Sequence, residues 1–211
     1  MKLEGLKINF LGDSITKGVG TSSDDMIYHT RLKANANLKE IRSYGVNGSR
    51  IARQQGENDE GLPFCDRFPA MSDDADMVVV FGGTNDYGHG DAPIGGFCDR
   101  TPDTFYGACH YLFSGLVKKY LGKPIVIMTP LHRSNETDKN VSSGGTLKDY
   151  INIIREVAEY YSLPTLDLFS SSGIQPEIAE VKEMYMPDGL HPNDNGHSVI
   201  AHKLQMFLER L

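Results

Sequence analysis

A serine follows the first apolar run of the chain directly, within the segment Gly12-Asp13-Ser14-Ile15-Thr16. The run at 8–11 has the composition of a strand. A serine at the end of a strand can direct its hydroxyl into a crevice, and the backbone N–H groups that follow the serine can face an anion there. Such a hydroxyl can act as a nucleophile once a base takes its proton. A plain turn accounts for the segment equally well, and neither GxxxxGK[ST] nor GxGxxG, the spacings of phosphate-binding loops, is present.

Two further segments could supply hydrogen-bond donors. The segment 44–50 contains Gly48, and the absence of a side chain there would let the backbone approach a ligand and direct an N–H at it. The segment 82–86 ends the most apolar run and contains Asn85, whose amide can donate to a developing oxyanion. The alternatives are a simple turn at Gly48 and an Asx-turn at Asn85 or Asp86.

A histidine and a carboxylate occur together late in the sequence, in Asp188-Gly189-Leu190-His191-Pro192-Asn193. Histidine is the natural general base at neutral pH. A turn through Gly189 would let the carboxylate of Asp188 reach Nδ1–H of His191 and fix the tautomer of the ring. For an isolated Asp-x-x-His pattern, a polar segment that caps the following helix is the simpler interpretation.

The four segments taken together resemble the motifs of the SGNH (GDSL-type) hydrolase superfamily, a group of esterases, acetylesterases, thioesterases and lysophospholipases. The resemblance spans residues 8–197, and the segments occur in the order of the family. Asn85 in its Gly-Thr-Asn-Asp context and the Asp-x-x-His-Pro-Asn segment are the more specific matches. Ile15 stands where the motif that names the family has leucine.

The resemblance implies a role for each matched residue. Ser14 would be the nucleophile, and His191 would be the base, oriented by Asp188. The backbone N–H groups of Ser14 and Gly48 and the side-chain amide of Asn85 would form the oxyanion hole. The reaction would then be hydrolysis of an ester through an acyl-enzyme intermediate.

Metal and cofactor chemistry is not indicated. The histidines other than His191 show neither HExxH nor another metal-ligand spacing, so we expect neither a metal nor a cofactor. His197 and His202 remain competing candidates for the base, and Asp86 remains a competing acid.

Hydrophobic patterns indicate the elements that must position these residues. Five β-rich runs predict strands, at 8–11, 41–46, 77–81, 125–128 and 165–169. Helical spacing predicts helices at 105–120, 147–161 and after Asn193, and a less regular one near 26–38. Thr101 and Pro102 are predicted to be the N-cap and the first helical residue of the helix that includes 105–120.

Alternation of strands and helices predicts a doubly wound α/β fold. We expect three α/β/α layers around a central, mostly parallel, five-stranded sheet, the flavodoxin-like arrangement that the resemblance also implies. The runs at 77–81 and 125–128 are continuously apolar, as strands covered on both faces should be. Ligands in such folds bind beyond the carboxyl ends of the strands, and all four segments lie at such an end or just before the last helix.

Composition narrows the class of protein. The chain has 211 residues, with 21 basic and 28 acidic ones, and its net charge of −7 argues against partners such as nucleic acid or an anionic membrane. No apolar run approaches the ~18 residues of a membrane span, and the charged start of the sequence does not look like a secretory signal. We therefore expect one domain over residues 1–211, a cytoplasmic location and free thiols. The oligomeric state stays open.

The substrate is the least defined feature. Two polar segments, 87–100 and 131–145, should shape the pocket. Candidate substrate contacts are the polar residues Asp13, His89, Asp91, His132 and Arg133, although each could equally be a solvated loop residue. Because these loops are polar and no long amphipathic lid is evident, we expect a small-molecule or carbohydrate ester, with a short acyl group on a polar alcohol. The alternatives are a lysophospholipase or acyl-thioester hydrolase, and an inactive ligand-binding protein of the same fold.

Overall fold

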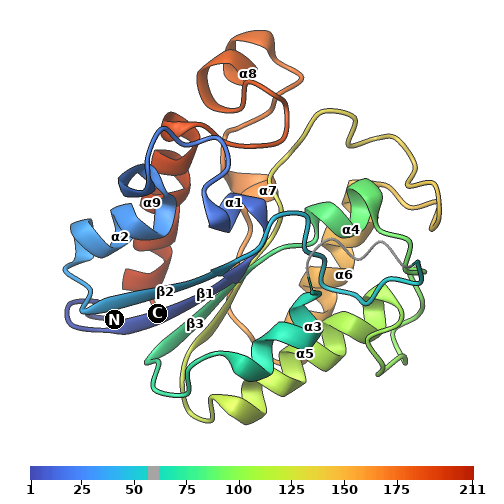
Figure 1. The fold of residues 1–211 in the computed structure, drawn as a ribbon, viewed down its shortest axis with the longest axis horizontal. Helices are drawn as coiled ribbons and strands as arrows, with labels where there is room; N and C mark the ends of the chain where they lie inside the picture. The colour runs from blue at the N-terminus through green and yellow to red at the C-terminus, as the bar shows by residue number, and fades with distance from the viewer. Residues whose placement is uncertain (57–61) are drawn as a thin grey trace.

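Five parallel strands form the central sheet of the computed structural model, which describes residues 1–56 and 62–211 (Figure 1). They are β1 (Lys7–Gly12), β2 (Glu40–Gly45), β3 (Met77–Phe81), β4 (Ile125–Met128) and β5 (Thr165–Leu166), in the order β2-β1-β3-β4-β5. All four neighbouring pairs are parallel, which confirms the predicted fold class. The strand order reverses between β1 and β3, and in doubly wound sheets ligands bind at this switch point.

Helices cover both faces of the sheet (Figure 1). One face carries α2 (Tyr28–Ala36) and α9 (Asp194–Glu209), and the other carries α3 (Phe64–Arg67), α5 (Phe105–Lys119) and α6 (Leu147–Tyr160). Alternate residues of β3 pack into the two cores. Val78 and Val80 lie in the core with α5 and α6, whereas Met77, Val79 and Phe81 lie in the core with α2 and α9. This explains why the run is apolar without interruption.

Short elements occupy the loops of the fold. They are α1 (Ser14–Lys17), α4 (Thr84–His89), α7 (Leu168–Ser171) and α8 (Ala179–Tyr185), with 3₁₀ turns at Asp24–Met26 and Phe68–Ala70. Helix α1 directly follows β1, and α4 directly follows β3. Both helices therefore begin at the carboxyl edge of the sheet. None of the helices in the two described ranges combines the length and apolar character needed to cross a bilayer.

Two predicted boundaries were wrong. The helix expected to begin at Pro102 begins at Phe105, because the side chain of Thr104 accepts a hydrogen bond from Gly107 N at 3.1 Å and is the N-cap. The strand expected to reach residue 169 ends at Leu166, because the side chain of Asp167 caps α7. The helix predicted after Asn193 is confirmed as α9, and the side chain of Asn193 is its N-cap because it accepts from two N–H groups of the first turn.

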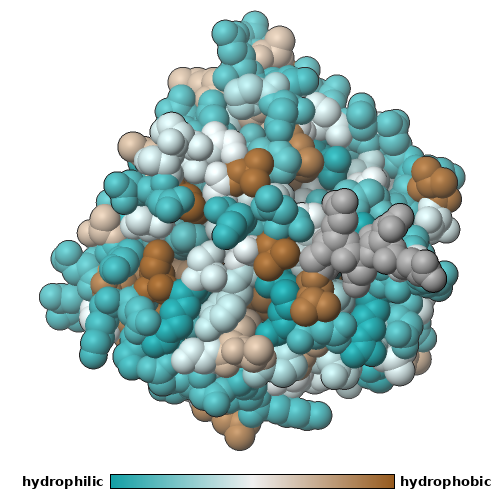
Figure 2. All heavy atoms as spheres, in the orientation of Figure 1, coloured by the Kyte–Doolittle hydropathy of each residue, from teal (hydrophilic) through white to brown (hydrophobic). Residues whose placement is uncertain are grey.

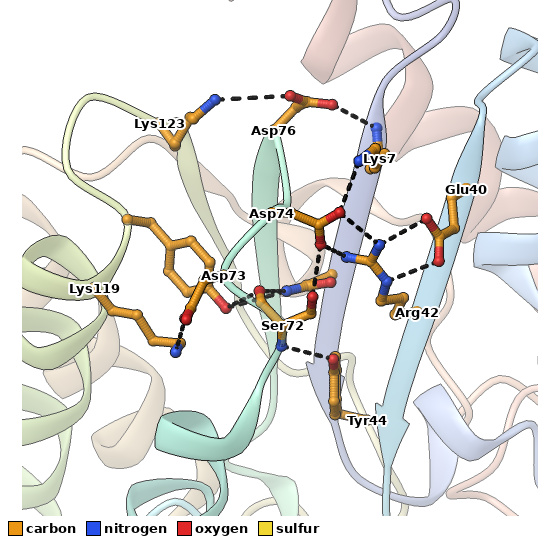
Figure 3. Close-up of polar contacts among 12 residues, drawn as sticks. Lys7, Glu40, Arg42, Tyr44, Ser72, Asp73, Asp74, Asp76, Lys119 and Lys123 are labelled. Atoms are coloured by element: carbon orange, nitrogen blue, oxygen red, sulfur yellow. Dashed lines mark hydrogen bonds and ion pairs between the residues drawn. The ribbon is translucent and has the colours of Figure 1, made fainter.

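Charged side chains join the amino-terminal ends of β1 and β2 to the loop before β3 (Figure 3). Arg42 pairs with Glu40 at 2.7 Å and with Asp74 at 2.6 Å, and Asp74 also pairs with Lys7 Nζ at 2.7 Å. Asp76 accepts a hydrogen bond from Lys7 N at 2.9 Å. These bonds fix the edge of the sheet opposite to the one that carries the four motifs.

Candidate active site

Ser14 is the first residue of α1, directly after the tight turn at Asp13 that follows β1. The side chain of Asp13 accepts a hydrogen bond from Ile15 N at 2.9 Å and so caps the first turn of α1, while Asp13 O accepts from Lys17 N at 2.9 Å. Since β1 ends at Gly12, the turn holds the hydroxyl of Ser14 at the carboxyl edge of the sheet. The Ser14 side chain is largely buried, with 6% of the residue surface exposed.

Ser14, His191 and Asp188 form one hydrogen-bonded series. Ser14 Oγ lies 3.0 Å from His191 Nε2, and His191 Nδ1 lies 2.7 Å from Asp188 Oδ2. The second carboxylate oxygen of Asp188 accepts from the backbone N–H groups of His191, at 2.7 Å, and Leu190, at 2.8 Å. Asp188 therefore fixes both the ring of His191 and the turn that carries it. The φ of +78° at Gly189 permits this turn.

The electrostatics keep the carboxylate of Asp188 charged beside the imidazole of His191. Partial burial raises the pKa of Asp188, but the hydrogen bonds from the backbone and ring of His191 and from Leu190 outweigh this effect and leave the pKa below its usual value. An ionised Asp188 accepts the Nδ1–H of His191. This selects the tautomer in which Nε2 can accept the proton of Ser14.

The side chains of Ser14 and His191 border a cavity of about 260 Å³. Its other lining residues include Gly48 and Asn85, so four of the five residues matched to the family motifs line the cavity, and the fifth, Asp188, is bonded to His191. Asn85 Nδ2 donates to Ser49 O at 3.1 Å, which links the start of α4 to the loop after β2. Gly48 has a φ of +69°, a conformation that favours glycine. Val19, Asn47 and Leu190 complete the wall with His89 and Arg133.

A buried carboxylate holds the loop that carries Gly48. Asp86 is 3% exposed and accepts hydrogen bonds from Ile51 N at 2.9 Å and Ala52 N at 3.0 Å. Burial raises the pKa of Asp86 to about 6, although these hydrogen bonds oppose the shift. Burial also raises the pKa of Asp13 to about 7, with a smaller contribution from the charge of Asp86.

The sequence patterns did not single out Arg67, which lies on the short helix α3. Its guanidinium donates to Gly12 O at 3.0 Å, to Tyr44 O at 2.6 Å and to Ser49 Oγ at 2.9 Å. It therefore ties the ends of β1 and β2 to the loop after β2. No motif includes this arginine, so only the tertiary structure reveals its position.

Two of the predicted substrate contacts, His89 and Arg133, line the cavity, and three do not. The Asp13 carboxylate is used as the cap of α1. His132 Nδ1 lies 2.8 Å from Glu136 Oε2, and Asp91 accepts from the backbone of residues 55 and 56. The structure thus does not bring Asp13, His132 and Asp91 to the cavity, because local hydrogen bonds hold these side chains elsewhere.

The competing histidines lie outside the cavity lining. His197 Nδ1 accepts from Tyr28 N at 3.1 Å in the buried core, and His202 is exposed on α9. Within residues 1–56 and 62–211, no group of three or more His, Cys, Asp or Glu side chains is arranged to hold a metal ion. The geometry at Ser14 is that of a hydroxyl activated by an imidazole and a carboxylate, an arrangement suited to acyl transfer.

Comparison with known proteins agrees with this geometry. A model of the GDSL-like lipase/acylhydrolase family matches residues 10–199. No curated protein matches the chain. A solved structure of a protein from Lactobacillus plantarum has a TM-score of 0.85 at 32% identity, covering 98% of both chains.

Two more distant structures share the fold. A possible lipase from Chitinophaga pinensis has a TM-score of 0.73 at 22% identity, covering 97% of this chain and 98% of its own. A two-domain esterase active on acetylated mannans has a TM-score of 0.67 at 20% identity, covering 98% of this chain and 49% of its own.

Proposed function

This chain belongs to the GDSL-like lipase/acylhydrolase family and is an ester-hydrolysing SGNH hydrolase, and from that premise we propose that it removes short acyl groups from a polar, carbohydrate-like alcohol. The observation that carries the proposal is the hydrogen-bonded series of Ser14, His191 and Asp188, whose first two members line a small cavity. Ser14 is the proposed nucleophile, His191 the base and Asp188 the orienting acid.

The first half of the reaction forms an acyl-enzyme. Ser14 Oγ attacks the ester carbonyl while His191 Nε2 takes the hydroxyl proton, and the resulting imidazolium is stabilised by Asp188. The tetrahedral intermediate collapses when His191 returns the proton to the leaving alcohol. Water then attacks the acyl-enzyme with the same base and releases the acid together with free Ser14.

The negative charge of the tetrahedral intermediate needs donors that are already in place. We assign this role to the backbone N–H groups of Ser14 and Gly48 and to the side-chain amide of Asn85, all of which border the cavity. An amide carries two N–H donors. One donates to Ser49 O, and the second is the proposed donor to the oxyanion.

The size and lining of the cavity support a short acyl group. Its volume of about 260 Å³ lies below the roughly 300–1,000 Å³ typical of ligand pockets, and its aliphatic side chains are those of Val19 and Leu190. A long acyl chain would need an extended apolar groove. On the described part of the face in Figure 2, apolar residues lie scattered among hydrophilic ones.

The proposal of a polar alcohol is supported by two polar side chains that line the cavity. His89 and Arg133 can bond to hydroxyl groups of a leaving alcohol. The esterase active on acetylated mannans has the same fold as this chain, and this likeness motivates the choice of acetylated sugars as first substrates.

A series of p-nitrophenyl esters from acetyl to dodecanoyl, together with acetylated sugars and a lysophospholipid, tests the proposal. We expect the largest kcat/KM for acetyl esters and hydrolysis of the acetylated sugars. A preference for dodecanoyl esters or the lysophospholipid would contradict the short-acyl assignment. Absence of all hydrolysis, with no labelling of Ser14 by an active-site phosphonate, would point to an inactive binding protein.

A further inference from the structure

A second cavity of about 200 Å³ adjoins the one that contains Ser14. Its lining comes from the C-terminal part of α4 and from residues 133–141. The Arg133 side chain lines both cavities, so a molecule bound at Ser14 could extend past this guanidinium into the second cavity. The polar side chains there include Asn135, Asp138 and Lys139.

Arg133 is held in a defined position between the two cavities. Its Nη1 donates to Thr84 O at 3.1 Å, and its guanidinium carbon lies 5.4 Å from the centre of the Tyr87 ring. A Cβ on Gly88 would lie 2.6 Å from Nη1, so the missing side chain at Gly88 lets the guanidinium pack against α4. Arg133 Nε is buried without a hydrogen-bond partner among the described residues.

The segment 134–141, which lines the second cavity together with Arg133, is held to α4 by hydrogen bonds. Asn140 is 7% exposed, and its Nδ2 donates to Tyr87 O at 2.8 Å and Gly90 O at 3.0 Å. Its Oδ1 accepts from the backbone of residues 142 and 143. The hydroxyl of Tyr87 donates to Asn135 O and Asp138 O. The segment that lines the cavity is therefore tied to α4 on both sides of Asp138, and the cavity is formed before any ligand binds.

We infer that the second cavity is a subsite for the alcohol part of the substrate and that it takes a second sugar unit joined to the acylated one. This inference rests on the proposed function. Sugar hydroxyls both donate and accept hydrogen bonds, and this wall offers an exposed carboxylate at Asp138 and an exposed ammonium at Lys139 beside Arg133. An aliphatic chain in the same place would displace water from these groups and offer no hydrogen bond in return.

The test compares three substrates and one double variant. The substrates are p-nitrophenyl acetate, an O-acetylated monosaccharide and an O-acetylated disaccharide. In the variant, Asp138→Ala and Lys139→Ala remove two exposed side chains that line only the second cavity, leaving the net charge unchanged. The matched control combines Lys118→Ala on α5 with Glu159→Ala on α6, two exposed residues that line neither cavity.

We expect the wild type to prefer the disaccharide. In the Asp138→Ala/Lys139→Ala variant, kcat/KM for the disaccharide should fall roughly tenfold to a hundredfold, as loss of two hydrogen bonds implies. Activity on p-nitrophenyl acetate should stay unchanged, and the control should match the wild type throughout. An unchanged disaccharide rate in the variant would overturn the subsite while leaving the proposed function intact. Hydrolysis of p-nitrophenyl acetate without hydrolysis of either sugar would instead overturn the proposed substrate class and the subsite with it.

Discussion

The Oγ of Ser14 lies 3.0 Å from Nε2 of His191, although 177 positions separate the two residues in the sequence. Each residue stands in a turn held by a nearby aspartate. Asp13 accepts from the backbone N–H one residue after Ser14, and Asp188 accepts from the backbone N–H of His191 itself. The two turns are thus fixed independently by local hydrogen bonds. The contact between them needs only the parallel sheet to bring β1 close to the start of α9.

The first prediction concerns the nucleophile. Replacing Ser14 with Ala should lower kcat for ester hydrolysis by several orders of magnitude, because members of a catalytic triad act as a unit. The free energy of unfolding should change little, since Asp13 rather than the serine hydroxyl caps α1. Steady-state kinetics on p-nitrophenyl acetate and thermal unfolding measure the two effects. A folded Ser14→Ala protein that keeps most of its activity would exclude this mechanism.

The second prediction concerns the oxyanion hole. Replacing Asn85 with Ala should lower kcat by roughly 10²–10³, or about 2.7–4 kcal/mol, with a smaller effect on KM. The reason is that the amide would meet a charge that exists only in the transition state. Asn85→Asp keeps the size but replaces the donors with acceptors, so it should be at least as damaging. If KM alone rises in both variants, Asn85 binds substrate or only maintains the contact with Ser49.

The third prediction separates the proposed base from the competing histidines. His191→Ala should be nearly as damaging as loss of the nucleophile, whereas His197→Gln and His202→Ala should retain catalysis, because only His191 of the three contacts Ser14. Asp188→Asn should also lower kcat, but less than His191→Ala, since the carboxylate orients the ring without taking the proton. Kinetics on p-nitrophenyl acetate rank these variants. A silent Asp188→Asn substitution would mean that Ser14 and His191 work as a dyad.

The motif residues could be identified from the sequence because each lies in a short local pattern. Asn85 follows a turn at Gly83, and the turn that joins Asp188 to His191 contains Gly189, so the geometry of each depends on a few neighbouring residues. The sequence could not reveal Arg67, because three of its acceptors come from the ends of β1 and β2 and from the loop after β2. Nor could it place His132, whose partner Glu136 lies in the same polar loop and holds it away from the cavity.

Element ends were harder to predict than their cores for a related reason. The apolar patterns correctly placed the start of the strand at Thr165 and the body of the helix at Phe105–Lys119. Their limits depend on which polar side chain caps the neighbouring turn. Asp167 and Thr104 each offered a competing hydrogen bond that hydrophobic periodicity does not register.

The fourth prediction concerns Asp86 as a positioning residue. Asp86→Asn replaces the Oδ2 acceptor of Ile51 N with an amide NH2, so a donor faces that N–H and only the bonds of Ile51 N and Ala52 N to Oδ1 remain. The loop carrying Gly48 should shift, and kcat should fall by about tenfold, or about 1.4 kcal/mol, with KM less affected. Asp91→Asn is the matched control, because Asp91 holds residues 55 and 56 farther along the same segment. Equal losses in the two variants would show that the effect is not specific to the oxyanion loop.

The dependence of stability on pH has contributions of opposite sign. His197 is fully buried, and its Nδ1 accepts from Tyr28 N. Burial lowers its pKa to about 4, with the charges of His29 and Arg31 adding to the shift. Asp13 and Asp86 have pKa values raised to about 7 and about 6 by burial. These two carboxyl groups reduce stability as pH rises from about 4.

The fifth prediction isolates the contribution of His197 to the pH dependence of stability, by comparing the wild type with a variant that cannot titrate at this position. The unfolded chain takes up a proton at His197 near pH 6.5, whereas the native protein does so only near pH 4. The stabilising contribution of neutral His197 is therefore complete above about pH 6.5 and is lost as the pH falls toward 4. Since a pKa difference of one unit corresponds to about 1.4 kcal/mol, the free energy of unfolding should fall by up to roughly 3 kcal/mol over this interval. His197→Gln keeps an acceptor for Tyr28 N but cannot titrate, so its free energy of unfolding should vary less steeply over this interval. Urea unfolding of both proteins between pH 4 and pH 7 measures the difference, from which the shared effects of Asp13 and Asp86 cancel. Parallel curves would mean that His197 is protonated in the native protein as readily as in the unfolded chain.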